Sequence, residues 1–173
     1  MAPADVRLMI LIGALAGLRR NEIARFHTDC VTEYGLRIEG NGDRVRMIPL
    51  HPALACEIDA YRTERALTAG YFFTPSVSSR PHSTSHVGKL IGQRMSPGIT
   101  PHKLRHRFAS KSHAGTYNPR AVQELLGHSS PATTARYVAT PEESLVAAVD
   151  AVPGIEGPEP IYHARLSVVR SRG

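Results

Sequence analysis

The sequence of 173 residues contains no tryptophan, and aromatic residues make up only 6% of it. A surface that binds nucleic-acid bases by stacking them on aromatic rings is therefore not the expected mode of ligand contact. Only two cysteines occur, Cys30 and Cys56. They are too few for a disulfide framework or a cysteine-based zinc site, so we expect two reduced thiols in a cytoplasmic protein.

A hydrophobic run long enough to span a membrane is also missing, because the apolar stretch at residues 8–18 is too short. A basic residue before this run and the small residues 14–16 resemble a signal peptide with its cleavage site. However, Asp5 lies in the supposed basic region, and Arg19 and Arg20 follow the run directly. We interpret the run as a buried helix whose end places Arg19 in a site, with no export and no membrane partner.

Lysine is scarce, since Lys89, Lys103 and Lys111 are the only lysines among the 21 Lys and Arg residues. The formal charge is +6 and the pI about 9.7, which favours a polyanionic partner. Arginine presents a planar fork of donors that can bind a phosphate through two hydrogen bonds. The preference for arginine therefore favours phosphate recognition.

The length allows one domain, and the residue pattern predicts helices around one β-hairpin. Two extended runs flank the turn sequence Gly40-Asn41-Gly42-Asp43, which is a strong hairpin signal. Thr100-Pro101 and Asn118-Pro119 each place a capping side chain before a proline, which is typical of a helix start. We expect strands at 35–39 and 44–50, a third strand or a core plug at 71–73, and helices at 3–16, 21–26, 52–66, 85–94, 101–112, 119–127, 141–149 and in a short segment from 130 that carries Tyr137.

Five short motifs follow one another along the chain. They are Gly17-Leu18-Arg19 with Glu22 three residues later, the hairpin ending in Ile48-Pro49-Leu50, Thr100-Pro101-His102-Lys103-Leu104-Arg105-His106, Leu125-Leu126-Gly127-His128, and Thr133-Thr134-Ala135-Arg136-Tyr137. Each motif alone is weak, because a single arginine is usually solvated and a single tyrosine usually packs. In this order, the motifs resemble the catalytic domain of the tyrosine recombinases, the phage integrase family. The resemblance covers about residues 8–149.

This resemblance implies an α+β fold that is mainly α with a small antiparallel β-sheet. It also implies a DNA strand-transfer reaction in which DNA is cut and rejoined through a 3′-phosphotyrosine, without a cofactor, a metal ion or a small-molecule substrate. The residues that match catalytic positions are Arg19 and Arg105 as a clamp on the phosphate, His102 as acid/base group, His128 as hydrogen-bond donor to the phosphate, and Tyr137 as nucleophile. Further contacts to DNA phosphates are expected from Arg20, Arg44, Lys103 and Arg107.

The sequence departs from the family at the hairpin, where the resemblance implies a lysine that protonates the leaving 5′ oxygen. Counting back from Pro49, that position is Asn41, and no lysine precedes Lys89. Arg44 is nearby, but a guanidinium group holds its proton too tightly to be a good proton donor. Loss of a general acid slows a reaction by roughly 10²- to 10⁴-fold, so we expect slow or absent cleavage with intact DNA binding.

The expected organisation is a catalytic domain at residues 1–150, followed at residues 151–173 by a linker and a basic, flexible C-terminal tail. Recombinases of this family usually carry an N-terminal helical domain that closes a clamp around DNA, and we expect this chain to lack it. The expected partners are double-stranded DNA and further copies of the chain, which assemble on DNA as a dimer or tetramer. Residues 142–149 and the tail would pack against a neighbouring copy there.

Three alternatives compete with an active recombinase. The first is a catalytically impaired, truncated recombinase that only binds DNA, which Asn41 favours, and the second is a type IB topoisomerase with the same chemistry. The third is a metal hydrolase, because His82 and His86, and likewise His102 and His106, have the four-residue spacing of zinc ligands on a helix. No glutamate follows the first histidine of either pair, as a zinc protease requires, so we expect no metal site.

Overall fold

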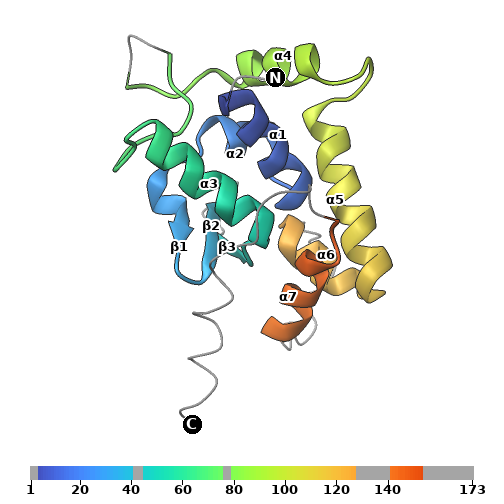
Figure 1. The fold of residues 1–173 in the computed structure, drawn as a ribbon. Coiled ribbons are helices and arrows are strands. Elements are labelled where there is room, and N and C mark those ends of the chain that lie inside the picture. The colour runs from blue at the N-terminus through green and yellow to red at the C-terminus, as the bar shows by residue number, and fades with distance from the viewer. Residues whose placement is uncertain (1–3, 41–44, 76–78, 128–140, 154–173) are drawn as a thin grey trace.

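The computed structural model describes residues 4–40, 45–75, 79–127 and 141–153 (Figure 1). Helices dominate and one small antiparallel sheet lies beside them, which confirms the predicted fold class. In chain order the elements are α1 (Ala4–Leu15), α2 (Arg20–Ala24), the 3₁₀ turn η1 (Thr28–Cys30), β1 (Val31–Thr32), β2 (Gly35–Glu39), β3 (Val45–Ile48), α3 (Pro52–Glu64), α4 (Thr84–Arg94), α5 (Pro101–Thr116), α6 (Pro119–Leu126) and α7 (Glu142–Asp150).

Helix α1 lies at the centre of the fold. Its apolar residues are buried because α3, α4 and α5 pack around it (Figure 1). This burial confirms the interpretation of the apolar N-terminal run as a core helix. Across the described ranges, no helix is long and apolar enough to cross a membrane.

The chain turns after α1 at Gly17, and this turn positions the first predicted site residue. Gly17 has a φ of +66°, and a Cβ atom there would lie 2.4 Å from Cδ1 of Phe108 in α5. Only glycine fits both the left-handed backbone and this close contact. Arg19 follows two residues later, at the N-cap of α2.

The sheet has the strand order β1-β2-β3, and both pairings are antiparallel. In the hairpin of β2 and β3, Leu36 pairs with Ile48 and Ile38 pairs with Arg46. Leu36, Ile38 and Ile48 are buried, so this face of the hairpin packs on the helices. The predicted hairpin is confirmed, whereas its turn at 41–44 lies outside the described residues.

The third strand is β1 and not the segment 71–73. Tyr71 makes only an isolated bridge with His27, and Phe72 and Phe73 are buried against other aromatic rings. Of the two alternatives for this segment, the core plug is correct. Two large side chains enter the core side by side here, which a strand with alternating faces does not allow.

The caps of α5 and α6 follow the local signals. Thr100 accepts a hydrogen bond from the Lys103 amide at 3.3 Å, and Asn118 accepts one from Ala121 at 3.1 Å. Helix α5 runs to Thr116, four residues beyond its predicted end, because its last turns pack on α7 and bury Ser112. Helix α6 ends at Leu126, and Gly127 caps it with a φ of +63°.

Residues just past position 150, where the domain is predicted to end, are packed on the fold. Val152 is buried, and its carbonyl oxygen lies 2.9 Å from Nε2 of His51. Residues 151–153 therefore continue the packing of α7, and the division into a catalytic domain and a linker with a tail stays a prediction. The expected helix that carries Tyr137 and the part of the expected linker and tail after residue 153 lie outside the described residues.

Candidate functional site

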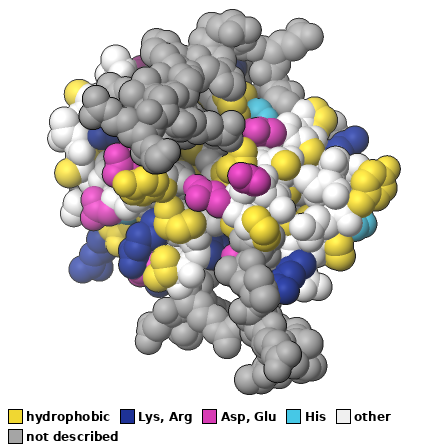
Figure 2. Space-filling model, turned by 90° about the horizontal axis from the view of Figure 1, so that it is seen from below, with side chains coloured by type: hydrophobic (Ala, Val, Ile, Leu, Met, Phe, Trp, Pro, Cys, Tyr) yellow, Lys and Arg dark blue, Asp and Glu magenta, His cyan; other side chains and the backbone are white. Residues whose placement is uncertain are grey.

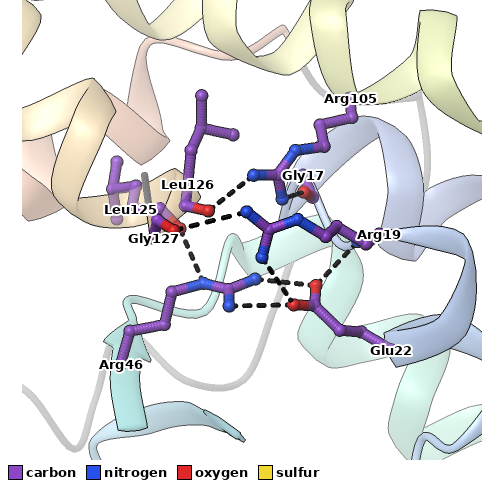
Figure 3. Close-up of polar contacts among 8 residues, drawn as sticks. All are labelled: Gly17, Arg19, Glu22, Arg46, Arg105, Leu125, Leu126 and Gly127. Atoms are coloured by element: carbon purple, nitrogen blue, oxygen red, sulfur yellow. Dashed lines mark hydrogen bonds and ion pairs between the residues drawn. The ribbon is translucent and has the colours of Figure 1, made fainter. Parts of the chain in front are cut away.

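Four charged side chains meet where the turn after α1, strand β3, helix α5 and the end of α6 come together (Figure 3). We call this group the arginine cluster: Arg19, Glu22, Arg46 and Arg105. Its hydrogen bonds connect segments that are far apart in the sequence. Three arginines against one glutamate give the cluster a net positive charge, as an anion site requires.

Arg105 is the most enclosed of the predicted clamp residues. Its Nη1 donates to the carbonyl of Gly17 at 2.6 Å and its Nη2 donates to the carbonyl of Leu126 at 2.5 Å. Burial lowers the pKa of Arg105 to about 10, together with the positive charge of Arg19. A guanidinium with this pKa remains protonated at neutral pH, so the clamp keeps its charge.

Arg19 is more open and bridges α2 to the end of α6. Its backbone amide donates to Oε2 of Glu22 at 2.7 Å, and its Nη1 donates to Oε1 at 3.2 Å. Its Nη2 donates to the carbonyl of Gly127 at 3.3 Å. The Arg19 side chain is 38% exposed, which leaves it accessible to a ligand at the surface.

Arg46 was not among the residues singled out from the sequence. Its Nη1 and Nη2 donate to the two carboxylate oxygens of Glu22 at 3.0 and 2.8 Å, and its Nε donates to the carbonyl of Leu125 at 3.0 Å. The side chains of Arg46 and Glu22 are only 8% and 5% exposed. The only sequence signal was an arginine between apolar neighbours on a strand, which does not reveal its partners.

Glu22 is the negative centre of the cluster. Burial alone would raise the pKa of its carboxyl group, but the hydrogen bonds and charge of Arg46, together with those of Arg19, lower it. Glu22 is therefore ionised at neutral pH and orders the arginines around it.

The end of α6 attracts the arginines for a physical reason. The last carbonyls of a helix have no partner within the helix and carry its negative dipole end. Arg46, Arg105 and Arg19 donate to the carbonyls of three successive residues, Leu125, Leu126 and Gly127. Figure 3 shows the Arg19 guanidinium between those of the other two arginines. The cluster thus lies at the residue that directly precedes position 128.

The remaining predicted residues on α5 lie outside the cluster. His102 is exposed three residues before the buried Arg105, and its Nε2 lies 2.8 Å from Nε2 of His106. One ring must donate the hydrogen and the other accept it. Lys103 is exposed, and Arg107 donates to the carbonyls of Ala14 and Pro153 at 3.4 and 3.3 Å.

Arg20 is exposed and lies against α4, because a Cβ atom at Gly88 would come within 3.1 Å of its side chain. It therefore points away from the cluster that contains its neighbour Arg19. The phosphate contacts expected of Arg20, Lys103 and Arg107 stay predictions. Four other predicted site residues lie outside the described residues: Asn41, Arg44, His128 and Tyr137.

The part of the chain that the structure describes contains no group of three or more His, Cys, Asp or Glu side chains that could hold a metal ion. His82, just before α4, and His86 on α4 have ring centroids 4.6 Å apart, and those of His102 and His106 on α5 lie 4.3 Å apart. Figure 2 shows the face of the molecule seen from below. Acidic side chains lie near the middle of its described part, and Lys and Arg side chains lie toward the edges. This face therefore carries both signs of charge.

Comparison with known proteins gives a consistent result. The family model of the phage integrase family matches residues 1–143. Tyrosine recombinase XerA of Thermococcus kodakarensis is 37% identical over 147 residues, which cover 80% of this chain and 52% of XerA. Tyrosine recombinase XerD of Rhizobium meliloti is 34% identical over 157 residues, covering 82% of this chain and 50% of XerD. The chain spans about half the length of the curated relatives it matches.

Solved structures share the fold. The integrase from mycobacterium phage Brujita superposes with a TM-score of 0.72 at 22% identity, covering 93% of this chain and 56% of the integrase. The XerH site-specific recombinase, solved with its difH substrate in a pre-cleavage complex, gives a TM-score of 0.59 at 27% identity, covering 73% of this chain and 40% of XerH.

Proposed function

The chain belongs to the phage integrase family, and on this premise we propose that it is the catalytic domain of a site-specific tyrosine recombinase. Its substrate is double-stranded DNA, which it cuts and rejoins, and a cytoplasmic location fits this role. The XerH structures with difH support this substrate class, since they were solved before and after cleavage. Assembly of several copies on DNA belongs to the same proposal, as in the lambda integrase dimer on its core site.

The observation that carries the proposal is the convergence of Arg19 and Arg105. They come from segments far apart in the sequence, yet their guanidinium groups donate to adjacent carbonyls at the end of α6. Two guanidinium groups side by side can bind both non-bridging oxygens of one phosphate and stabilise the charge that develops there. His128 follows Gly127 directly in the sequence, and in this proposal it donates a further hydrogen bond to the phosphate.

The proposed reaction uses Tyr137 as the nucleophile. Its phenolic oxygen forms a bond to the phosphorus, the bond from phosphorus to the 5′ oxygen breaks, and a 3′-phosphotyrosine remains. His102 takes the phenolic proton, because a neutral imidazole has a ring nitrogen that can accept one. The tyrosine ester conserves the energy of the phosphodiester bond, so a 5′ hydroxyl can reverse the step without ATP.

Asn41 makes this reaction slow in our proposal. The leaving 5′ oxygen needs a proton, and asparagine cannot supply one as a lysine ammonium would. The expected penalty is about 10²- to 10⁴-fold in the cleavage rate. DNA binding is retained, because it depends on charge and shape and not on proton transfer.

Covalent capture tests the proposal without knowledge of the target sequence. The full chain is incubated with a pool of labelled duplexes that carry random sequence beside a fixed nick, so that a cleaved strand loses the short fragment that carries the freed 5′ hydroxyl. We expect a labelled protein–DNA adduct that survives denaturation, together with enrichment of particular sequences in the adduct. The matched control is Tyr137→Phe, which keeps the ring but removes the nucleophilic oxygen.

A second substrate isolates the missing general acid. On the enriched sequence, the 5′ oxygen is replaced by a bridging sulfur, whose thiolate leaves without protonation because thiols are far more acidic than alcohols. Adduct formation should then become faster by roughly 10²-fold or more. An adduct that forms equally well with Tyr137→Phe would refute the proposed nucleophile.

The second candidate function is a DNA-binding protein without strand cleavage. The asparagine at position 41, in place of the family's lysine, favours it. The same assay separates the two functions. A chain that shifts the mobility of the duplex pool but forms no adduct, even with the bridging sulfur, would be a binding protein only.

A further inference from the structure

We propose that Arg46 is a positioning residue of the phosphate clamp, holding Glu22 and the end of α6 together and thereby orienting Arg19. This inference rests on the proposed function, because it concerns how the clamp of that reaction is built. It gives the β-hairpin a role in the site that is independent of the residue at its tip.

The place of Arg46 in the sheet is unusual for an arginine. It pairs with Ile38 across the hairpin and lies on the same face as Ile48, which is buried, while Val45 and Met47 point outward and are exposed. A strand position that faces the core normally carries an apolar side chain. A buried guanidinium is tolerated only where its donors find partners.

Those partners come from two other segments of the chain. One carboxylate and one helix-terminal carbonyl take up three N–H groups of Arg46, on Nε, Nη1 and Nη2. The two parallel bonds to Glu22 are the bidentate geometry that only arginine forms with a carboxylate. Arg46 therefore links β3 to α2 and to α6 at fixed relative positions.

Arg46 differs from the two clamp arginines in the partner of its guanidinium group. Its Nη1 and Nη2 form a bidentate pair with the Glu22 carboxylate, which neutralises the charge, and its side chain is 8% exposed. The buried Arg105 donates to uncharged carbonyls and keeps its charge for a phosphate, and Arg19 is 38% exposed. A DNA phosphate approaching the cluster from solvent meets Arg19 before Arg46. Arg46 thus acts through other residues and is not a phosphate contact.

The link to Arg19 passes through both oxygens of Glu22. Oε1 accepts from Nη1 of Arg46 and from Nη1 of Arg19, at 3.0 and 3.2 Å. Oε2 accepts from Nη2 of Arg46 and from the Arg19 backbone amide, at 2.8 and 2.7 Å. Without Arg46, the carboxylate is free to turn toward Arg19 alone, and the guanidinium of Arg19 loses its fixed place.

The second link passes through α6. Nε of Arg46 holds the carbonyl of Leu125, and Nη2 of Arg19 holds the carbonyl of Gly127, two residues further on. Arg46 and Arg19, which are connected through Glu22, are thus both bonded to the same helix terminus. This closed set of contacts fixes the clamp relative to the carbonyls of Leu125 and Gly127.

The test compares Arg46→Met and Arg46→Lys with the control Arg37→Met. Arg37 lies in the same hairpin and forms an exposed ion pair with Glu39 at 2.8 Å, so its loss removes the same charge without touching the cluster. The adduct-forming rate is measured at saturating protein on the sequence selected by covalent capture, and DNA affinity is measured separately.

For Arg46→Met, we expect the adduct rate to fall by about 10²-fold, because a misplacement of about 1 Å in a clamp has that effect, while affinity changes by about threefold or less. Arg46→Lys should recover little of the rate, since an ammonium cannot bind the carboxylate and the carbonyl together. Arg46→Lys also keeps the buried positive charge, so this variant is used for the test if Arg46→Met does not fold. If a variant forms the adduct at the wild-type rate per folded molecule and only its folded fraction is smaller, the proposal is overturned.

The pH profile supplies a readout that lost stability alone would not move. Glu22 faces Arg19 at the N-cap of α2, Arg46 on β3 and Arg105 on α5, and the end of α6 offers it only carbonyls. In Arg46→Met, burial of Glu22 is opposed by fewer charges, so its pKa should rise. The acid side of the rate profile should then move toward neutral pH, whereas Arg37→Met should leave it in place.

Two measurements on the protein without DNA separate this inference from the proposed function. Carboxyl NMR of Glu22 should show a higher pKa in Arg46→Met, and hydrogen exchange at residues 125–127 should accelerate by about tenfold or more. If wild type forms no adduct but both measurements change as stated, the proposed function fails and the positioning contact stands. If wild type forms the adduct and Arg46→Met leaves the rate, the profile and both measurements unchanged, Arg46 has no positioning role.

Discussion

Replacing Glu22 by glutamine removes the negative centre of the arginine cluster and keeps nearly the same shape. Glu22 forms an ion pair with Arg46 at 2.8 Å, in which both side chains are less than one tenth exposed. Its pair with Arg19 measures 3.2 Å, and that arginine is 38% exposed. The first pair therefore dominates the effect on stability, because solvent weakens the second.

Breaking a buried ion pair on one side destabilises a protein by about 3–5 kcal/mol, since the remaining charge stays buried without compensation. Glutamine retains one acceptor oxygen for Arg46, which places the expected loss of unfolding free energy at the lower end, about 3 kcal/mol. For a domain of this size, this corresponds to a decrease in melting temperature of roughly 6–12 °C. Urea unfolding at pH 7 measures the free energy directly.

The pH dependence of this loss provides a sharper check. The folded state lowers the pKa of Glu22 below its ordinary value of 4.5, so the carboxylate contributes its full stability above that pH. The contribution disappears as the pH falls through the lowered pKa, because the protonated carboxyl resembles glutamine. The difference between wild type and Glu22→Gln should be constant above about pH 5 and should shrink below about pH 4.5.

The exposed pair of Arg37 and Glu39 provides the control for this experiment. Glu39→Gln should change the unfolding free energy by less than about 1 kcal/mol at any of these pH values. If Glu22→Gln loses no more stability than Glu39→Gln at pH 7, or if its loss persists unchanged at pH 3, the reasoning about the buried pair is refuted.

Three further substitutions follow from the structure. Gly17→Ala should lower the unfolding free energy by about 2 kcal/mol or more, because a Cβ atom would clash with Phe108 at a backbone φ of +66°, and thermal unfolding at wild-type temperature would contradict this. Arg105→Lys should reduce adduct formation on the selected duplex by roughly 10²- to 10³-fold, because one ammonium cannot replace two guanidinium donors, and a wild-type rate would exclude Arg105 from the clamp. Asn41→Lys should accelerate adduct formation by about 10²-fold with normal DNA and hardly at all with a bridging sulfur, and equal rates on normal DNA would show that position 41 does not face the leaving oxygen.

Several elements were predictable because their signals are local. The apolar run of α1, the glycine-bounded hairpin, the caps at Thr100 and Asn118 and the glycine at 127 each depend on residues a few positions apart. Capping bonds, proline geometry and the left-handed preference of glycine act over this short range. The fold class and the family therefore followed from the sequence.

Other features depend on how distant segments pack. At 71–73, a third strand could not be distinguished from a core plug. Both are short apolar segments, and they differ only in the residues that surround them. The burial of Val152 was likewise not evident from the sequence, because its contact is with His51, about 100 positions earlier. Burial of a terminal residue is decided by the partner that covers it.

The sequence by itself determined the family, the order of the motifs and the positions of Arg19 and Arg105. Only the tertiary structure decided what holds them, since Arg46 binds a carboxylate 24 positions away and a carbonyl 79 positions away. The apolar residues beside Arg46 even suggest that it points to solvent, and the pairing of Ile38 with Arg46 shows the opposite. A side chain's face on a strand depends on register and on what covers the sheet, which short-range propensities do not contain.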